Sequence, residues 1–458
     1  MSIVAASVSR LRSSFRGEIV DPADAGYDDA RRVWSALHDR RPALIVRPVD
    51  VADIAAAIRY GRDADLLIAV RGGGHSITGH STCDDGLVID LSLMRGVTVD
   101  PMHRLARANG GAFLSELDRA AQDHGLVCPV GTVGHTGVAG LALAGGVGRL
   151  QRMFGLTLDN ITAVELVTAD GRLVRASDAD EPDLFWAMRG AGANFGVVTA
   201  LEFRLHPYGG DLVRGLRIYR PADAAAVWQG VRQMFPSAPR ELALSFVIGR
   251  AVPPEEYEPE IAGGPIAIVA YSYFGTEADA QATLAPLNDG PSPVMDTMGP
   301  KRYLDIQGTY DEAYGWGQRY YCHGAFANDL RDETIERLVS LVADVPGDPG
   351  FALSAQGGAI SDLDEAATAF AGRSATYRTI AESFWTDAQD DEAAIEWGRR
   401  AAAIAEPDSI PLRYVNEVFE DGTDLATVYG PDKLERLVAI KRAWDPDNVF
   451  RSNHNIVP

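Results

Sequence analysis

A buried strand that runs straight into three consecutive glycines constrains this fold more than any other feature of the sequence. The apolar run at residues 66–70 (LLIAV) predicts the strand, and the glycine-rich segment 71–79 (RGGGHSITG) follows it directly. Glycines let the backbone approach a ligand closely and direct successive N–H groups at it, as a diphosphate requires. A single loop of this kind favours a plain tight turn, and only further loops shift the prediction towards a ligand site.

Two further glycine-rich segments occur in the same part of the chain, at residues 131–148 and 189–196. Three such loops together favour a large cofactor that carries a diphosphate. The chain has no GxxxxGK[ST] motif, which excludes a Walker-type nucleoside triphosphatase. It also lacks a GxGxxG that opens a long helix with an acidic residue about 20 positions further on, so we expect no Rossmann dinucleotide site.

Alternating strand and helix patterns surround the first glycine loop. Residues 42–48 predict a strand, apolar positions at helical spacing from 51 to 58 predict a helix, and the strand at 66–70 completes a β-α-β unit. Later patterns predict strands at 163–168, 173–176 and 197–205, and a short helix at 183–188. We therefore expect residues 1–207 to form a first domain.

The middle and the end of the chain follow different patterns. The predicted elements of the middle are strands at 242–248 and 266–273 and helices at 332–342 and 390–404. They indicate an α+β domain, which we expect to span residues 208–411. Residues 412–458 return to the style of the first domain, with a helix predicted from Pro431. We expect this last segment to pack on the first domain.

Five segments of the sequence resemble one family of flavoproteins. They are RGGGHS (71–76), FGLTLDN (154–160), DLFWAMRGAGANFGVVT (183–199), YVN (414–416) and WDPDNVFRSNHNIVP (444–458). Together they resemble the FAD-linked oxidases of the berberine bridge enzyme type, a group of the vanillyl-alcohol oxidase superfamily, and most closely its bacterial members with a single covalent flavin bond in secondary metabolism. The resemblance is weak in the middle of the chain, where these enzymes bind their substrates.

The resemblance implies a fold and a reaction. The fold is α+β, with a two-part FAD-binding domain (a β-α-β subdomain and a mixed sheet) and an α+β substrate domain whose antiparallel sheet covers the flavin. The reaction is hydride transfer from a small organic substrate (an alcohol, a sugar, or an aromatic or polyketide intermediate) to flavin N5, with O2 reoxidising the flavin to give H2O2. The alternatives are a flavin-N5-oxide oxygenase, a flavin dehydrogenase with another electron acceptor, and a flavin carrier without catalysis.

By this resemblance, His75 carries the flavin covalently through the 8α-methyl carbon. A neutral imidazole is a good nucleophile near pH 7, so the residue type suits the bond. His75, His80, Cys83 and Asp84 include enough ligand types to hold a metal instead. A glycine loop does not fix the geometry of metal ligands, however, and we expect no metal.

Many relatives attach the flavin a second time, through a cysteine in the pattern CPxVGxGGH. When the glycines of this pattern are matched to residues 137–140, the cysteine position falls on Val133, and Cys128 lies five residues earlier. We therefore predict attachment through His75 alone, and a small buried side chain at Cys128.

The motifs and loops also imply which residues contact FAD. Most of them are glycines or small polar residues, as a backbone cradle for an extended ligand requires. Besides His75, Tyr414 and Asn416, the predicted contacts are Arg71, Gly72, Gly73, Gly74, Ser76, Gly79, His80, Val133, His135, Thr136, Gly137, Gly140, Gly145, Gly148, Asn160, Gly196, Val198, Asn453 and Asn455.

Four residues are candidates for the chemistry. The resemblance implies that Tyr414 accepts the substrate proton, although a free tyrosine titrates near ~10 and needs a partner to do so at neutral pH. If residues 356–362 form a strand, Gln356 and Asp362 share one face of it and lie over the flavin, or the strand lies at an edge with Asp362 in solvent. His323 is either a donor in the pocket or a structural histidine.

Charge and composition narrow the partners. The 458 residues carry a formal net charge of -22, which repels phosphate backbones and anionic lipid, so we expect neither nucleic acid nor a membrane surface as a partner. The sequence shows no run of about 18 apolar residues, no signal-peptide pattern and no disulfide framework among its three cysteines, which predicts a cytoplasmic protein. The expected partners are a small-molecule substrate and O2, and the expected state is a monomer or a weak homo-oligomer.

Overall fold

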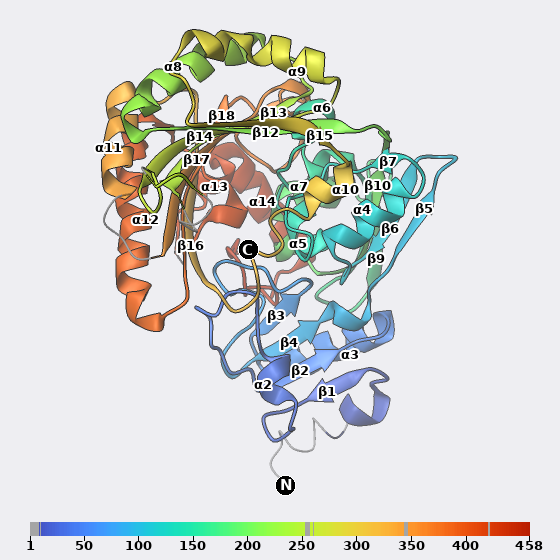
Figure 1. The fold of residues 1–458 in the computed structure, drawn as a ribbon. Helices are drawn as coiled ribbons and strands as arrows, with labels where there is room; N and C mark the ends of the chain where they lie inside the picture. Colours follow the sequence, from blue (N-terminus) through green and yellow to red (C-terminus); the bar gives the residue numbers. More distant parts are fainter. Residues whose placement is uncertain (1–8, 10, 252–256, 260, 343–346, 420–421) are drawn as a thin grey trace.

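A mixed four-stranded sheet lies next to the first glycine loop. In this computed structural model, which describes residues 9, 11–251, 257–259, 261–342, 347–419 and 422–458, the strand order is β1-β2-β4-β3 (Figure 1). The strands are β1 (Glu18–Val20), β2 (Leu44–Arg47), β3 (Ile68–Arg71) and β4 (Leu87–Asp90). Strands β2, β4 and β3 are parallel, and β1 is antiparallel to β2. Helix α3 (Val51–Asp63) links β2 to β3 and confirms the predicted β-α-β unit.

Helix α3 forms because its sequence supplies both a cap and an apolar face. The Asp50 side chain accepts a hydrogen bond from the N–H of Asp53 at the start of the helix. Ile54, Ala57 and Ile58 lie on one face and are fully buried against the sheet. This packing fixes β3, and the glycine loop starts where β3 ends.

A five-stranded antiparallel sheet forms the second part of the N-terminal region, in the order β5-β6-β10-β8-β9. Its strands are β5 (Val97–Asp100), β6 (Leu105–Asn109), β8 (Ile161–Val167), β9 (Leu173–Ser177) and β10 (Val197–Arg204). The other elements of this region are α2 (Tyr27–Ala30), α4 (Leu114–Gln122), α5 (Val138–Ala142), α6 (Gln151–Phe154), α7 (Pro182–Ala191), and the paired strands β7 (Leu126–Val127) and β11 (His206–Pro207). The strands and the helix predicted between 163 and 205 are confirmed, with small shifts at their ends.

An eight-stranded antiparallel sheet occupies the middle of the chain, in the order β15-β12-β14-β13-β17-β18-β16-β19. Its strands are β12 (Leu212–Tyr219), β13 (Leu242–Arg250), β14 (Pro265–Tyr273), β15 (Met295–Lys301), β16 (Arg319–Ala327), β17 (Asp348–Ala355), β18 (Tyr377–Trp385) and β19 (Ser409–Ile410). The helices of this region are α8 (Ala224–Met234), α9 (Glu277–Leu284), α10 (Tyr303–Gln307), α11 (Asp332–Val342) and α12 (Asp391–Ala405). Helices α8, α9, α11 and α12 cover the outer face, so the inner face turns towards the N-terminal sheets (Figure 1).

The C-terminal segment returns to the N-terminal region, as the sequence predicts. It contains α13 (Ala426–Tyr429) and α14 (Pro431–Trp444). The Arg436 guanidinium lies 4.0 Å from the ring centroid of Trp186 on α7. Lys441 is fully buried and donates to the Asp445 carboxylate at 2.7 Å and to the carbonyl of Asn194 at 2.8 Å.

The sequence left open whether residues 356–362 form a strand, and the structure shows that they do not. Strand β17 ends at Ala355, and Gly357 and Gly358 then adopt φ values of 77° and 59°. Positive φ at two successive residues bends the chain out of the sheet, and a single 3-10 turn follows. A Cβ at Gly358 would lie 2.4 Å from the carbonyl oxygen of Arg152, so the turn packs tightly on α6.

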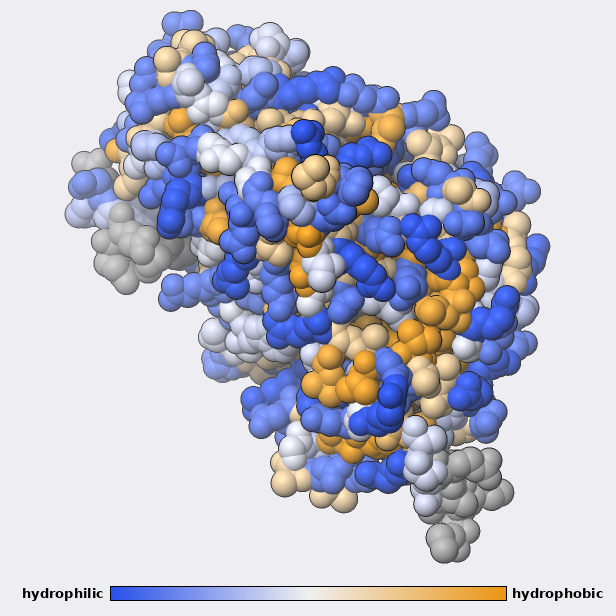
Figure 2. Space-filling model, turned by 90° about the vertical axis from the view of Figure 1, so that its right-hand side faces the viewer, coloured by the Kyte–Doolittle hydropathy of each residue, from blue (hydrophilic) through white to orange (hydrophobic). Residues whose placement is uncertain are grey.

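One face of the molecule is largely polar (Figure 2). Figure 2 shows hydrophilic side chains over most of one face, with hydrophobic side chains gathered mainly in the lower half of that view. Within the described ranges, none of the helices has the length and apolar character needed to cross a membrane.

Candidate active site

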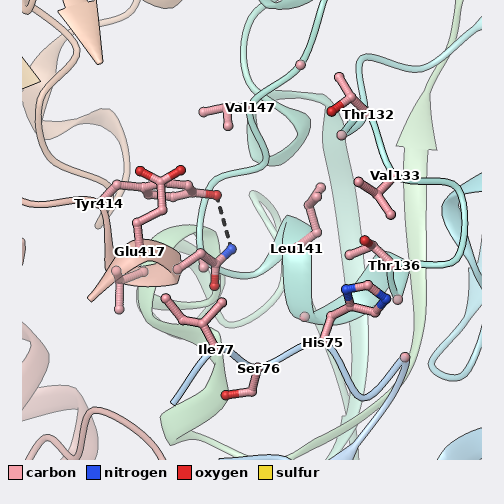
Figure 3. A pocket seen from close by; sticks show the side chains of 18 of the residues that line it. His75, Ser76, Ile77, Thr132, Val133, Thr136, Leu141, Val147, Tyr414 and Glu417 are labelled. Atoms are coloured by element: carbon pink, nitrogen blue, oxygen red, sulfur yellow. Dashed lines mark hydrogen bonds between the residues drawn. The ribbon is translucent and has the colours of Figure 1, made fainter. Parts of the chain in front are cut away.

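A cavity of about 850 Å³ lies between the glycine loops and the inner face of the eight-stranded sheet. Its wall combines the loop after β3, the segment around α5, the 190–198 segment, the C-terminal segment and side chains from six strands of the sheet. In Figure 3, His75 and Thr136 lie on one side of the pocket, and Tyr414 and Glu417 lie on the other. The volume falls in the upper part of the range for ligand and cofactor sites.

The glycines hold two loops together backbone to backbone. A Cβ at Gly73 would lie 2.2 Å from the amide nitrogen of Gly137, and a Cβ at Gly137 would lie 2.4 Å from the nitrogen of Gly73. Buried polar atoms without a hydrogen-bond partner among the described residues also face this region, namely Ser81 Oγ and Asn453 Oδ1. A backbone cradle with unpaired polar atoms fits a ligand that is long, flat and rich in hydrogen-bonding groups, as FAD is.

His75 is held as a neutral imidazole. Its ring stacks on Trp34 at 4.8 Å between ring centroids, and its Nε2 lies 2.7 Å from Nδ1 of His135. Burial lowers the pKa of His75 to about 3, and the nearby His135 adds to the effect. At neutral pH the side chain is therefore uncharged and retains a nucleophilic nitrogen.

Hydrogen bonding determines which nitrogen of His75 is nucleophilic. The Nε2 atom of His135 lies 3.2 Å from the backbone carbonyl oxygen of Asp311, which can only accept, so His135 carries its proton on Nε2. In the neutral pair, Nδ1 of His135 is then an acceptor, and His75 donates to it from Nε2. The lone pair of His75 consequently resides on Nδ1.

A buried acid–base cluster lines the sheet side of the cavity. The hydroxyls of Tyr320 and Tyr314 donate to Oε2 of Glu382 at 2.8 and 3.1 Å. Arg378 forms a short ion pair with Glu417. Burial raises the pKa of Glu382 above its usual range and raises the pKa of Glu417 to about 7, although Arg378 opposes the shift.

Tyr414 is a hydrogen-bond acceptor in this structure, and its acidity is suppressed. Its hydroxyl oxygen accepts from the N–H of Gly146 at 2.9 Å and from the side-chain amide of Asn416 at 3.0 Å, the latter drawn in Figure 3. Burial raises the pKa of Tyr414 to about 12. This raised pKa does not favour Tyr414 as the group that accepts the substrate proton, and its role in the reaction stays a prediction.

Comparison with known proteins gives the family. A model described as FAD binding domain matches residues 42–177, and one described as Berberine and berberine like matches residues 413–457. The (R)-6-hydroxynicotine oxidase of Paenarthrobacter nicotinovorans is 31% identical over 469 residues, which cover 97% of each chain. The chain belongs to the FAD-linked oxidases of the berberine bridge enzyme type. It is an FAD-dependent oxidoreductase that oxidises small organic molecules.

Solved structures of this family share the fold over nearly the whole chain. The 6-hydroxy-D-nicotine oxidase from Arthrobacter nicotinovorans superimposes with a TM-score of 0.86 at 28% identity, covering 97% of this chain and 98% of that one. The carbohydrate oxidase from Microdochium nivale superimposes with a TM-score of 0.86 at 22% identity, covering 99% of each chain, which shows the shared fold alone.

Most predicted FAD contacts of this family member lie on the cavity wall. They come from all three glycine loops and from the C-terminal segment. These residues are Gly72, Gly73, Gly74, His75, Ser76, His80, Val133, Thr136, Gly137, Gly140, Gly148, Gly196, Val198, Tyr414, Asn416 and Asn453.

Six predicted contacts are not part of the cavity wall. The Arg71 guanidinium donates to the carbonyls of Ala30 and Arg32, and the Asn160 amide donates to the carbonyls of Phe154 and Leu156. The remaining four are Gly79 beside His38, His135 behind His75, Gly145 against the ring of Tyr414, and Asn455.

The structure places three candidate catalytic residues away from the cavity wall, which corrects the role predicted for them. Asp362 is exposed and forms a surface ion pair with Arg240 at 2.6 Å, because the chain leaves the sheet at Gly357. Gln356 is fully buried but is not part of the cavity wall. The His323 ring lies 2.6 Å from an Arg413 nitrogen and is also absent from the wall.

The cavity wall also contains residues that the sequence patterns did not single out, among them Trp34, Glu382, Arg378 and Glu417. Glu417 directly follows the Tyr-x-Asn pattern, which was the one local signal for it. Cys128 is fully buried and away from the wall, which confirms the small buried side chain predicted there. Among the described residues, no three His, Cys, Asp or Glu side chains are grouped to hold a metal ion.

Proposed function

We propose that this protein is an oxidase that holds FAD through a single covalent bond from Nδ1 of His75. The observation that carries the proposal is the neutral His75, with Nε2 engaged by His135 and the lone pair left on Nδ1. Val133, where many relatives place a second attachment residue, has no nucleophilic atom, and Cys128 lies off the cavity wall.

FAD, when bound, supplies the hydride acceptor for the substrate and the centre at which O2 is reduced to H2O2. Glu382 takes the proton that the substrate loses. Its carboxylate lines the cavity and is held by two phenols, and its raised pKa makes it a better base than an ordinary carboxylate. Arg378, which forms an ion pair with Glu417, opposes the rise in the pKa of Glu382.

Tyr414 serves to position the flavin rather than to take protons. Its hydroxyl accepts two hydrogen bonds and keeps its own proton, which is thus available to donate to a bound group. The ring of Tyr414 packs directly on Gly145, because a Cβ at Gly145 would lie only 2.7 Å from a carbon of that ring.

The proposed substrate is a small organic molecule that lies on the inner face of the eight-stranded sheet. The central strands present small and apolar side chains there, such as Ala243, Val247, Ala270 and Ala352. By their names, the proteins compared above are oxidases of a hydroxynicotine and of carbohydrates, so this fold accommodates more than one substrate class. We further propose a cytoplasmic protein that works as a monomer or a weak homo-oligomer, with O2 as its second substrate.

The covalent link is tested by acid precipitation of the purified holoenzyme. We expect the yellow colour to stay with the pellet of the wild-type protein and of Cys128→Ala, and to pass to the supernatant with His75→Ala. His135→Phe removes the acceptor that sets the tautomer of His75, so we expect it to lower the covalent fraction while flavin still binds. A coloured His75→Ala pellet would contradict the proposal.

The oxidase assignment is tested on the flavin itself. Flavin reduced by light and EDTA without oxygen is mixed with air-saturated buffer, and H2O2 is measured. We expect one H2O2 per flavin and rapid reoxidation. Slow reoxidation would indicate a dehydrogenase, and a stable oxygenated flavin spectrum without peroxide would indicate the N5-oxide chemistry.

A further inference from the structure

Two guanidinium groups at one end of the cavity have no carboxylate partner among the described residues. Arg149 and Arg214 both line the cavity, and neither forms an ion pair within the ranges the structure describes. Arg149 has only 9% of its surface exposed. Buried cations are normally paired, since an isolated one is costly to desolvate. An unpaired, nearly buried arginine in a cavity wall therefore points to an anionic ligand.

The contacts of Arg149 leave one donor group free. Its Nη1 donates to Oε1 of Gln307 at 3.0 Å, and its guanidinium lies 5.1 Å from the ring centroid of Tyr310. Its Nη2 is buried and makes no well-aligned hydrogen bond with the described residues, and the nearby Tyr310 hydroxyl interacts with the guanidinium only loosely. A buried donor without a partner costs free energy that a bound acceptor recovers.

Arg214 brings the second positive charge to the same place. Its Nη1 donates to the backbone carbonyl of Tyr271 at 2.8 Å, and its Nη2 lies 3.4 Å from the hydroxyl of Tyr310. These neutral partners orient the guanidinium without cancelling its charge. Tyr310 thus lies between the two arginines and keeps them at one site.

Two carboxyl groups of this region make no direct contact with the arginine pair. Asp118 is linked to Arg149 only through Gln307, whose amide donates to Asp118 at 3.1 Å, and burial raises the pKa of Asp118 to about 7. Glu382 lies on β18, four strand spacings from Arg214 on β12, which is about 19 Å across the sheet. Neither carboxyl group forms an ion pair with Arg149 or Arg214 within the described part of the chain.

Arg152 on α6, close to Arg149 in the sequence, is an arginine with a purely structural role and serves as a comparison. Its guanidinium donates to the backbone carbonyls of Gln356, Pro239, Leu242 and Ala238. Every one of its three nitrogens has a partner, so it fastens α6 to the substrate side and leaves nothing for a ligand. Arg149 differs in having an unused nitrogen.

We propose that Arg149 and Arg214 form an anion subsite that binds a carboxylate group of the substrate, which makes the substrate an organic acid with an apolar body. This inference rests on the proposed function, because it names the substrate class of the same cavity. A carboxylate accepts from two guanidinium groups at once, and the small apolar side chains of the central strands accommodate the rest of the molecule.

The test uses the holoenzyme and the visible spectrum of its flavin. Benzoate, phenylacetate and hexanoate are titrated, each beside its neutral amide, with inorganic phosphate as a further anion. We expect at least one carboxylate to perturb the spectrum at a concentration tenfold or more below its amide and below phosphate. Arg149→Gln and Arg214→Gln should each weaken carboxylate binding tenfold or more, and Arg149→Lys, which keeps the charge, should weaken it less.

Arg240→Gln is the matched control, because Arg240 forms a surface ion pair outside the cavity and should leave binding unchanged. Equal binding of acids and amides, or carboxylate affinity that survives both glutamine variants, would overturn the subsite. The covalent flavin is measured on the same preparations by acid precipitation. Flavin lost from the wild-type pellet would contradict the proposed attachment, whereas retained flavin without carboxylate preference would contradict only the subsite.

Discussion

At the scale of single residues, burial decides which side chain of this site exchanges protons. Tyr414 and Glu382 both lie on the cavity wall, and burial raises the pKa of both. A pKa of about 12 places the Tyr414 phenol too far above neutral pH to suit a general base. For a carboxyl group, an upward shift moves it towards neutral pH, where a general base works best. The same physical effect therefore disables one candidate and suits the other.

Glu382→Gln tests the base. We expect kcat to fall by roughly 10²–10⁴, the usual contribution of a general base. In the wild-type enzyme, kcat/KM should fall as pH falls through the raised pKa of Glu382, because the protonated carboxyl cannot accept a proton. That limb should be missing from the pH profile of Glu382→Gln, measured with the best substrate found.

Tyr414→Phe serves as the comparison for this prediction. It removes the hydroxyl that Asn416 and Gly146 contact, so we expect a smaller loss of kcat and an unchanged acid limb. If Tyr414→Phe abolished that limb and Glu382→Gln retained it, the base would have to be assigned to the tyrosine.

At the scale of elements, local sequence patterns were enough to predict the glycine loops. The acid–base cluster, in contrast, depends on the pairing of strands that are far apart in the sequence. The β-α-β unit and its loop follow from periodicity within some 40 residues, and they were predicted. Glu382 meets Tyr320 because β16 pairs with β18, with Cys322 opposite Glu382. No local pattern encodes that register. Residues 356–362 do not form the strand considered for them, because two glycines adopt positive φ, which sequence alternation does not show.

Helices α4 and α10 are joined by a carboxyl group that is sensitive to pH. Asp118 on α4 accepts from the hydroxyl of Tyr303 and from the amide of Gln307, both at 3.1 Å. Burial raises its pKa from 3.8 to about 7. The folded state thus holds a proton that the unfolded state releases, so this contribution is full below about pH 4 and is lost as pH rises through 7.

Asp118→Asn should remove this pH dependence. We expect the melting temperature of the wild-type protein to fall relative to that of the variant as pH rises from 4 to 8, and the difference in unfolding free energy to change by up to about 4 kcal/mol. The readout is the slope against pH rather than the absolute stability, because the amide also changes the hydrogen bond with Gln307. Parallel curves for the two proteins would show that Asp118 does not titrate in this range.

At the scale of the whole molecule, the cavity exists only where three distant parts of the chain meet. The glycine loops, the inner face of the eight-stranded sheet and the C-terminal segment each form part of its wall. The 3-10 turn Thr157–Asn160 of the N-terminal region is tied to the substrate side by a buried ion pair, in which Arg373 donates to both oxygens of Asp159, at 2.6 and 3.0 Å. Both side chains are almost completely buried. This pair links the N-terminal region to the segment between β17 and β18, two strands of the sheet that lines the cavity.

Arg373→Met should therefore destabilise the whole molecule rather than one part of it. Removing one partner leaves the Asp159 carboxylate buried without compensation, which costs about 3–5 kcal/mol. We expect thermal unfolding followed by far-ultraviolet circular dichroism and by flavin absorbance to shift down together. The matched control is Arg240→Met, which breaks an exposed Arg–Asp pair of the same chemistry and should cost about 1 kcal/mol or less. Equal effects of the two substitutions, or a shift in only one of the two signals, would mean that the Arg373–Asp159 pair does not couple the two sides of the cavity.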